Sequence, residues 1–426
     1  MKHYLIALFT FAIGAQAQNG NVITVNIENE AARRFLAEVT YTPSDTSIIN
    51  KYNVSPPDNR QIPNPAVITI PDIDADSLLL TFSDSTDFSE GVHVMGVGKG
   101  SREVYVYNLL PQHTYYYKVT TLDDNILADG EIHTEGQLRM INVPGANNIR
   151  DLGGWPTIDG KRIKYGKIIR GSELNGQHTV DSAAIAILSD DLDIKSELDL
   201  RAFYDEGKDV SAFGFPTSST GNGSNPTYYY TNDSGQLVSH LTDSWNRIKW
   251  RREFNYITTC LNYNRNVYFH CAWGADRTGY LALFIEGVLG VNYSDLVKDY
   301  ELTSFYTTIH TKNKIDPVID FIKTCPGETL RDQFENFFVD SLGVNRSNIE
   351  TFRRIMLEDA KVDPGNNDNP DDDNPTTAIT DFNHQGRPLQ PSTIVDLRGH
   401  HIPGQAARKG IVIVTDSDGR TRKTVR

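Results

Sequence analysis

The fold of this chain is decided by residues 267–279, which read Val-Tyr-Phe-His-Cys-Ala-Trp-Gly-Ala-Asp-Arg-Thr-Gly. The apolar residues Val267 to Phe269 predict a short buried strand. The apolar run after Gly279 predicts a core helix that ends near Gly290. A strand, a tight loop and a helix N-terminus form the context in which backbone N–H groups converge on an anion. The stretch therefore predicts an anion-binding loop between a strand and a helix.

The side chains of this loop indicate nucleophilic chemistry on a phosphate. Cys271 lies where the predicted helix begins and close to an arginine, and both conditions favour a thiolate nucleophile over a neutral thiol. Arg277 can bind two phosphate oxygens through its planar guanidinium, which a lysine cannot do. Thr278 is placed to hydrogen-bond the thiolate when it departs in a second step. The residues between them are expected to bind phosphate as a P-loop: Ala272, Trp273, Gly274 and Ala275.

Cysteine, five residues, arginine and threonine resemble the signature of the cysteine-dependent protein tyrosine phosphatase superfamily. Three earlier stretches resemble landmarks of its bacterial and fungal tyrosine and dual-specificity branch: 148–154 (Asn-Ile-Arg-Asp-Leu-Gly-Gly), 166–172 and 198–201. The resemblance covers roughly residues 140–360. It implies an α/β domain with a central mixed sheet flanked by helices, which we assign to residues 138–362. The cysteine loop would lie at the carboxyl end of a strand, where open α/β sheets bind ligands.

Two other interpretations of the loop stay open. Cys271 could be a buried thiol that opens a core helix, with Arg277 as a surface charge. Alternatively, the loop could belong to a rhodanese-like sulfur carrier, which also holds an anion over a cysteine. The Arg-Thr-Gly ending favours the phosphatase over the sulfur carrier.

The proton donor for the leaving oxygen is harder to locate. Many relatives carry it on a Trp-Pro-Asp loop, which this chain lacks at the corresponding place. Some members of the branch have an aspartate just before the loop arginine, and Asp276 occupies that position. We expect Asp276 to be the general acid, with Asp243 as the alternative. Asp276 could equally serve only to hold the loop in place.

Other side chains bear on substrate binding. Relatives that act on phosphoinositides tend to carry a lysine where this chain has Ala275, which favours phosphotyrosine over a polyphosphorylated inositol. Trp273 could stack on an aromatic leaving group or only pack beneath the loop. Arg150 could bind phosphate, brace the loop or form a structural ion pair, for instance with Asp151. Two further arginines are expected in structural ion pairs, one of them with Glu206: Arg170 and Arg201.

The part of the chain before this domain falls into three predicted segments. Residues 1–17 combine a basic start, an apolar stretch and Ala-Gln-Ala, which predicts a secretory signal peptide. Residues 18–65 form an N-terminal extension. Residues 66–136 contain short strands at regular spacing and predict a small all-β sandwich. A Leu-Leu-Pro followed by Tyr115 resembles the fibronectin type III pattern, and the module would serve in docking or as a spacer.

The part after the domain has two segments. Residues 363–378 are acidic and rich in Pro and Asn, which predicts a disordered linker. Residues 379–426 contain two predicted strands, 394–399 and 409–414, before a basic end. They resemble the sorting tails of exported Bacteroidetes proteins and would serve as a surface-anchoring signal, or form only a small accessory hairpin.

These features together predict an exported cysteine-dependent phosphomonoesterase with tyrosine or dual specificity, located in the periplasm, at the cell surface or outside the cell. The alternatives are a phosphoinositide or inositol-phosphate phosphatase and a pseudophosphatase that only binds phosphorylated ligands. The mechanism requires no metal or cofactor, because amides and a guanidinium neutralise the phosphate. A net charge of −14 disfavours nucleic acid as a partner. Cys260 and Cys325 could form a disulfide.

Overall fold

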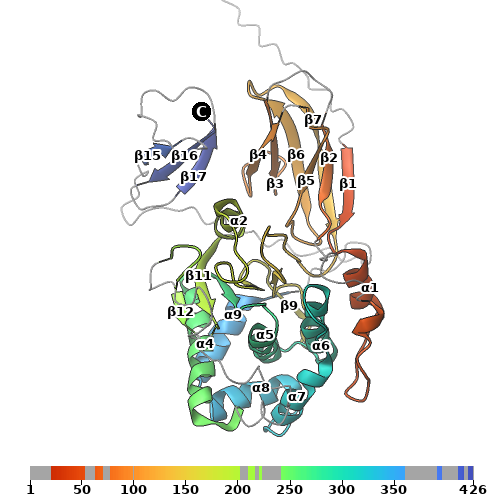
Figure 1. The fold of residues 1–426 in the computed structure, drawn as a ribbon, viewed down its shortest axis with the longest axis vertical. Helices are drawn as coiled ribbons and strands as arrows, with labels where there is room; N and C mark the ends of the chain where they lie inside the picture. The colour runs from red at the N-terminus through yellow and green to blue at the C-terminus, as the bar shows by residue number, and fades with distance from the viewer. Residues whose placement is uncertain are drawn as a thin grey trace, which may run out of the picture.

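The computed structural model describes residues 21–52, 63–70, 77–98, 100–201, 210–215, 220–222 and 241–359, together with the strands at 391–395, 411–416 and 421–425. The predicted signal peptide and linker lie outside these residues. Figure 1 shows a β module at one end of the molecule and a helix-rich α/β domain at the other. Within the described residues, no helix is both long and apolar enough to cross a membrane.

The β module consists of two sheets that share one hydrophobic cluster. The larger sheet has the order β1-β7-β6-β3-β4, and its strands are β1 (Asn21–Asn26), β3 (Ser77–Ser83), β4 (His93–Gly98), β6 (Thr114–Thr121) and β7 (Ile126–Glu135). In the smaller sheet, β2 (Ala66–Thr69) pairs with β5 (Glu103–Val106). Along β6, the side chains of Tyr115, Tyr117 and Val119 are buried because alternate residues of a strand face the same side. The backbone N–H of Leu110 donates to the Tyr115 hydroxyl at 2.9 Å, which ties the preceding turn to the sheet.

The α/β domain is built on a mixed sheet with the order β12-β11-β13-β10-β8. Its strands are β8 (Arg150–Asp151), β10 (Ile168–Gly171), β11 (Ile194–Asp199), β12 (Thr220–Asn222) and β13 (Asn266–His270). Only β8 runs antiparallel to its neighbour. Val267 and Phe269 join the large cluster on one face, whereas Tyr268 joins a smaller cluster on the other. The sheet is therefore covered on both faces, and the predicted mixed sheet is confirmed.

The helices that surround this sheet bury the predicted core helix completely. They are α2 (Ser182–Ala186), α4 (Ser244–Asn262), α5 (Asp276–Leu289), α6 (Tyr293–Leu302), α7 (Asp316–Ile322), α8 (Leu330–Asn336) and α9 (Arg346–Met356). Every residue of α5 from Arg277 to Leu289 is buried. The helix ends at Gly290 in the left-handed conformation, with φ of +97°, as its apolar length and terminal glycine predict. A small antiparallel pair, β9 (Lys161–Ile163) with β14 (Leu357–Asp359), closes the domain.

The described residues of the segment assigned to the N-terminal extension contribute to both parts of the molecule. Its first strand, β1, pairs in parallel with β7 of the β module. Its helix α1 (Glu30–Glu38) instead packs on the core of the α/β domain, where the Phe35 ring contacts Phe305. Figure 1 shows α1 beside α6, and Lys298 of α6 donates to the Leu36 carbonyl. We call residues 30–52 the strap.

Replacing Tyr41 of the strap with phenylalanine should destabilise the α/β domain by about 1–3 kcal/mol, the cost of leaving a buried polar group without a partner. The Tyr41 hydroxyl donates to Glu301 at 2.5 Å and accepts from the Ile48 backbone N–H. Urea unfolding of the full chain measures the change. Tyr105→Phe is the matched control, because the Tyr105 hydroxyl also bonds a carboxylate but at an exposed site. Equal midpoints for the two variants would contradict the expectation.

The described strands of the C-terminal tail form a three-stranded antiparallel sheet, not the two strands predicted. They are β15 (Pro391–Val395), β16 (Ile411–Asp416) and β17 (Thr421–Val425). The third strand falls on the basic end, whose sequence Thr-Arg-Lys-Thr-Val does not alternate apolar with polar residues and so gives no period-2 signal. The rest of the tail lies outside the described residues.

Candidate active site

The cysteine loop connects β13 to α5 and depends on one glycine for its shape. Gly274 has φ of +64°, a left-handed conformation that side chains with a Cβ atom rarely adopt. A Cβ atom at Gly274 would also lie 2.5 Å from the carbonyl carbon of Gly171 on β10. The loop therefore lies directly against the end of the neighbouring strand, and only glycine permits that approach.

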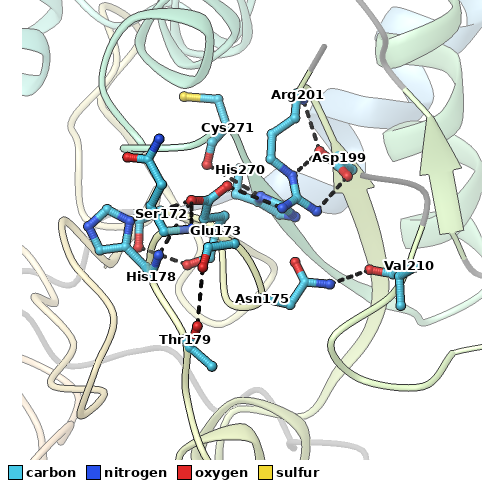
Figure 2. A network of polar contacts seen from close by, with 12 residues as sticks. Ser172, Glu173, Asn175, His178, Thr179, Asp199, Arg201, Val210, His270 and Cys271 are labelled. Carbon is cyan, nitrogen blue, oxygen red and sulfur yellow. Dashed lines mark hydrogen bonds and ion pairs between the residues drawn. The ribbon is translucent and has the colours of Figure 1, made fainter. Parts of the chain in front are cut away.

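The three residues predicted to carry the chemistry lie together at this turn. Cys271 is a free thiol, 3% exposed, and Figure 2 shows its sulfur directed away from the pair formed by Asp199 and Arg201. The Arg277 side chain returns from the first turn of α5, and its Nη1 donates to the Leu200 carbonyl at 3.1 Å. The Thr278 hydroxyl is buried without a hydrogen-bond partner among the described residues. It is thus available to a group bound in the loop.

Arg150 forms a buried structural ion pair, which is one of the roles considered for it. Its side chain is fully buried, and its Nε donates to Asp299 of α6 at 2.9 Å. The suggested alternative partner, Asp151, instead accepts backbone N–H groups from Gly153 and Gly166. The true partner comes from α6, about 150 residues further along the chain, where no local pattern reveals it.

Asp299 joins two arginines into a brace for the cysteine loop. It accepts from Arg150 and, through Oδ2, from Nη1 of Arg170 at 2.5 Å. Arg170 in turn donates from Nη2 to the Gly274 carbonyl at 3.1 Å, and Asn148 donates to the same oxygen at 2.8 Å. This carbonyl is therefore held toward the protein interior. The expected structural ion pair of Arg170 is confirmed, and it also fixes the loop.

A second network supports the loop from the β11 side (Figure 2). Arg201 pairs with Asp199 at 2.9 Å and with Glu173 at 3.1 Å, whereas the expected partner Glu206 lies outside the described residues. The Glu173 backbone N–H donates to the Ala272 carbonyl at 3.3 Å. Burial raises the pKa of Glu173, but hydrogen bonds from His178, Gln177 and Arg201 outweigh it and lower the value. Glu173 therefore stays a carboxylate.

Trp273 forms an aromatic rim rather than packing beneath the loop. Its side chain is 47% exposed, whereas His178 beside it is buried. The two rings meet edge to face, with centroids 4.5 Å apart. His178 is held by Glu173, so the indole contacts a fixed ring and is otherwise partly open to solvent.

Asp276 is the first residue of α5, and its Oδ1 faces three other groups. Lys314 Nζ lies 3.0 Å away, His310 Nε2 lies 3.2 Å away, and the Tyr300 hydroxyl lies 3.4 Å away. Burial raises the pKa of Asp276, but His310 and Lys314 together lower it to about 2. Unassisted, Asp276 is a carboxylate at neutral pH, which conflicts with a simple role as proton donor.

Asp243 has a structural role that its sequence context did not indicate. It is the N-cap of α4, and its carboxylate accepts the backbone N–H of Asn246 at 3.0 Å. The possible disulfide is also absent, because Cys260 and Cys325 are both free thiols. Cys260 is fully buried on α4.

Comparison with known proteins places this loop within one family. A family model described as the tyrosine phosphatase family matches residues 141–358, more than half of the chain. A protein of Cupriavidus necator, named as a candidate tyrosine-protein phosphatase, is 24% identical over 165 residues, which are 36% of this chain and 59% of that relative. The crystal structure of TpbA from P. aeruginosa matches 45% of this chain and 98% of its own at 16% identity, with a TM-score of 0.25. The family match contains the whole central sheet and the cysteine loop.

Proposed function

Because the chain belongs to the tyrosine phosphatase family, we propose that it is a cysteine-dependent phosphomonoesterase of tyrosine or dual specificity. The observation that carries the proposal is the free Cys271 directly after β13, followed in the first turn of α5 by Arg277. The Gly274 carbonyl is held inward by Arg170 and Asn148. Braced in this way, the loop can present backbone N–H groups to an anion.

In the proposed mechanism, the Cys271 thiolate attacks phosphorus while loop amides and Arg277 stabilise the equatorial oxygens. A water molecule then hydrolyses the phosphocysteine. The Thr278 hydroxyl, buried without a partner, can donate to the departing thiolate in this step. All these donors belong to the chain, so the mechanism includes no metal ion and no cofactor.

An aryl phosphate is the favoured substrate. The half-exposed Trp273, supported by His178, offers a flat apolar surface at the rim of the loop. Ala275 supplies no cation for a second phosphate. One observation favours the alternative of a phosphoinositide or inositol phosphate: Lys314, 37% exposed, places an ammonium group 3.0 Å from Asp276. We also propose export of the protein and surface anchoring by its tail, with the β module as a docking element or spacer.

A substrate panel tests the proposed function. We expect hydrolysis of a phosphotyrosine peptide, with lower kcat/KM for a phosphoserine peptide, a phosphoinositide and inositol hexakisphosphate. Trp273→Ala should reduce the preference for the phosphotyrosine peptide by about tenfold, the upper range of one aromatic contact. Preferential release of phosphate from the inositol compounds would favour the alternative substrate. Binding of the peptide without turnover would indicate a pseudophosphatase.

A further inference from the structure

The side chain of Asn108 in the β module bonds to a segment of the α/β domain. Asn108 lies between β5 and β6, half-buried, in the left-handed conformation with φ of +63°. Its Oδ1 accepts the Asn142 backbone N–H at 2.7 Å, and its Nδ2 donates to the Asn142 carbonyl at 3.0 Å. Its own carbonyl accepts from Nε of Arg139 at 3.0 Å. Asn108 therefore pairs with Asn142 as a neighbouring strand would, because a carboxamide has a donor beside an acceptor.

The position of Asn108 is fixed by the core of the β module. The next residue, Leu109, is buried in the hydrophobic cluster of that module. The backbone N–H of Leu110 donates to the Tyr115 hydroxyl of β6. Asparagine adopts the left-handed conformation more readily than most residues do, so this turn can present the Asn108 side chain at little cost in strain. Asn108 is thus a fixed point that holds part of the other domain.

The segment that Asn108 holds is one arm of a hairpin that leads to the cysteine loop. We call residues 139–151 the connecting hairpin. Its two arms are joined by the N–H of Ile141, which donates to the Ile149 carbonyl at 3.0 Å, and its second arm contains β8, which pairs with β10 of the central sheet. The first arm lies outside this pairing. An edge strand has no neighbouring strand on its outer side, so its outward N–H and C=O groups need another partner, and Asn108 supplies it to Asn142.

The turn of the connecting hairpin supports the cysteine loop directly. Buried Asn148 donates from Nδ2 to the Gly274 carbonyl at 2.8 Å. Beside it, the Asn147 N–H donates to the Ser172 hydroxyl and the Ser172 N–H donates to the Asn147 carbonyl, both at 3.0 Å. Only the turn separates Asn142 from Asn148. A shift of the first arm would therefore move the bond that holds the Gly274 carbonyl inward.

We propose that Asn108 is a positioning residue for the cysteine loop and that it acts through the connecting hairpin and the Asn148 carboxamide. The inference rests on the proposed function, since it concerns the loop to which that function assigns phosphate binding. It also gives the β module a role beyond docking or spacing, because the module holds one arm of the hairpin in place. When that arm is released, the Gly274 carbonyl can turn toward the bound anion, where its oxygen repels the phosphate.

Anion binding by the full chain tests the inference. Asn108→Gly removes the carboxamide but permits the left-handed backbone. We expect the dissociation constant of orthovanadate, measured by calorimetry, to rise about tenfold in this variant, the scale of coupling between separate sites. KM for phenyl phosphate should rise with it. Asn108→Asp should act in the same direction, because it keeps the acceptor for the Asn142 N–H but turns a second acceptor toward the Asn142 carbonyl. It carries the comparison should Asn108→Gly fail to fold.

A double-mutant cycle separates positioning from a general weakening of the domain. Asn148→Gly removes the bond to the Gly274 carbonyl and should weaken orthovanadate binding at least as much as Asn108→Gly does. The two substitutions together should weaken binding no further than Asn148→Gly alone, because Asn108 acts through Asn148. If the two effects instead multiply, Asn108 acts by another route and the inference is wrong. Urea unfolding of each variant shows that it is folded.

Asp124→Gly is the matched control, because Asp124 also has a left-handed backbone, with φ of +64°, in the exposed turn between β6 and β7 of the same module. Its dissociation constant should equal that of the wild type. No rise for Asn108→Gly, or an equal rise for Asp124→Gly, overturns the inference alone. A wild type that binds orthovanadate but hydrolyses no phosphate ester overturns the proposed function, and the binding comparison still decides the inference. A wild type that does neither overturns both.

Discussion

Cys271→Ser is expected to reduce kcat for an aryl phosphate by about 10⁴-fold or more, as for other enzymes that lose their nucleophile. A serine hydroxyl is a much weaker nucleophile than the sulfur that the proposed mechanism uses. Binding should survive, because the amides of the loop and Arg277 remain. A phosphotyrosine peptide should therefore still bind Cys271→Ser without being hydrolysed.

Cys325→Ser is the control for this substitution, because Cys325 is a free thiol after α7 and outside the loop. Its kcat should equal that of the wild type. Retention of turnover by Cys271→Ser would show that another group is the nucleophile. Transfer of sulfur from thiosulfate to cyanide by the wild type, in the absence of phosphatase activity, would instead support the rhodanese-like alternative.

Asp299→Asn is expected to destabilise the α/β domain by about 3–5 kcal/mol, the cost of breaking a buried ion pair. Asp299 is 2% exposed and pairs with two fully buried arginines, Arg150 and Arg170. Without its charge, two guanidinium groups remain buried and repel each other. Because Arg170 also holds the Gly274 carbonyl, we expect kcat/KM to fall together with stability.

Urea unfolding of the full chain, followed by a probe in the α/β domain, measures the first effect, since a chain with several domains can unfold in steps. Asp320→Asn is the matched control. It removes an ion pair of similar length, 3.0 Å to Lys323, at an exposed position, and such pairs contribute about 0–1 kcal/mol. If Asp299→Asn unfolds at the same urea concentration as this control, the brace does not stabilise the domain.

The residues that the sequence located correctly are those whose role depends on their neighbours along the chain. Cys271, Gly274 and Arg277 lie in one short stretch that runs from the end of a strand into the first turn of a helix, so spacing alone places them together. The residues that it missed come from distant helices and loops. Asp299 brings its carboxylate to Arg150 across 149 positions, and His310 reaches Asp276 from a segment after α6. Neither residue belongs to a recognisable sequence motif. A charged residue such as Asp299 on a helix normally indicates an exposed helix face, so its buried role cannot be predicted unless its partner is known.

The same limit explains why the sequence did not reveal what the N-terminal segment packs against. Helix α1 has only nine residues and is polar on most of its surface, and its buried positions are few. Such a short helix obtains its stability from tertiary packing rather than from its own sequence. Its place beside α6 could not be predicted without the surface that it covers.

This division of the N-terminal segment has a practical result for anyone who truncates the protein. A fragment that starts at residue 138 carries every residue of the family match, yet it leaves bare the apolar surface that Phe35 and Tyr41 cover. A fragment that ends before residue 138 keeps α1 but lacks the surface of the α/β domain on which α1 packs. We therefore expect that a single cut at this boundary leaves an apolar surface exposed on each fragment. An insoluble catalytic fragment would not be evidence against the proposed activity. Both halves must be expressed together.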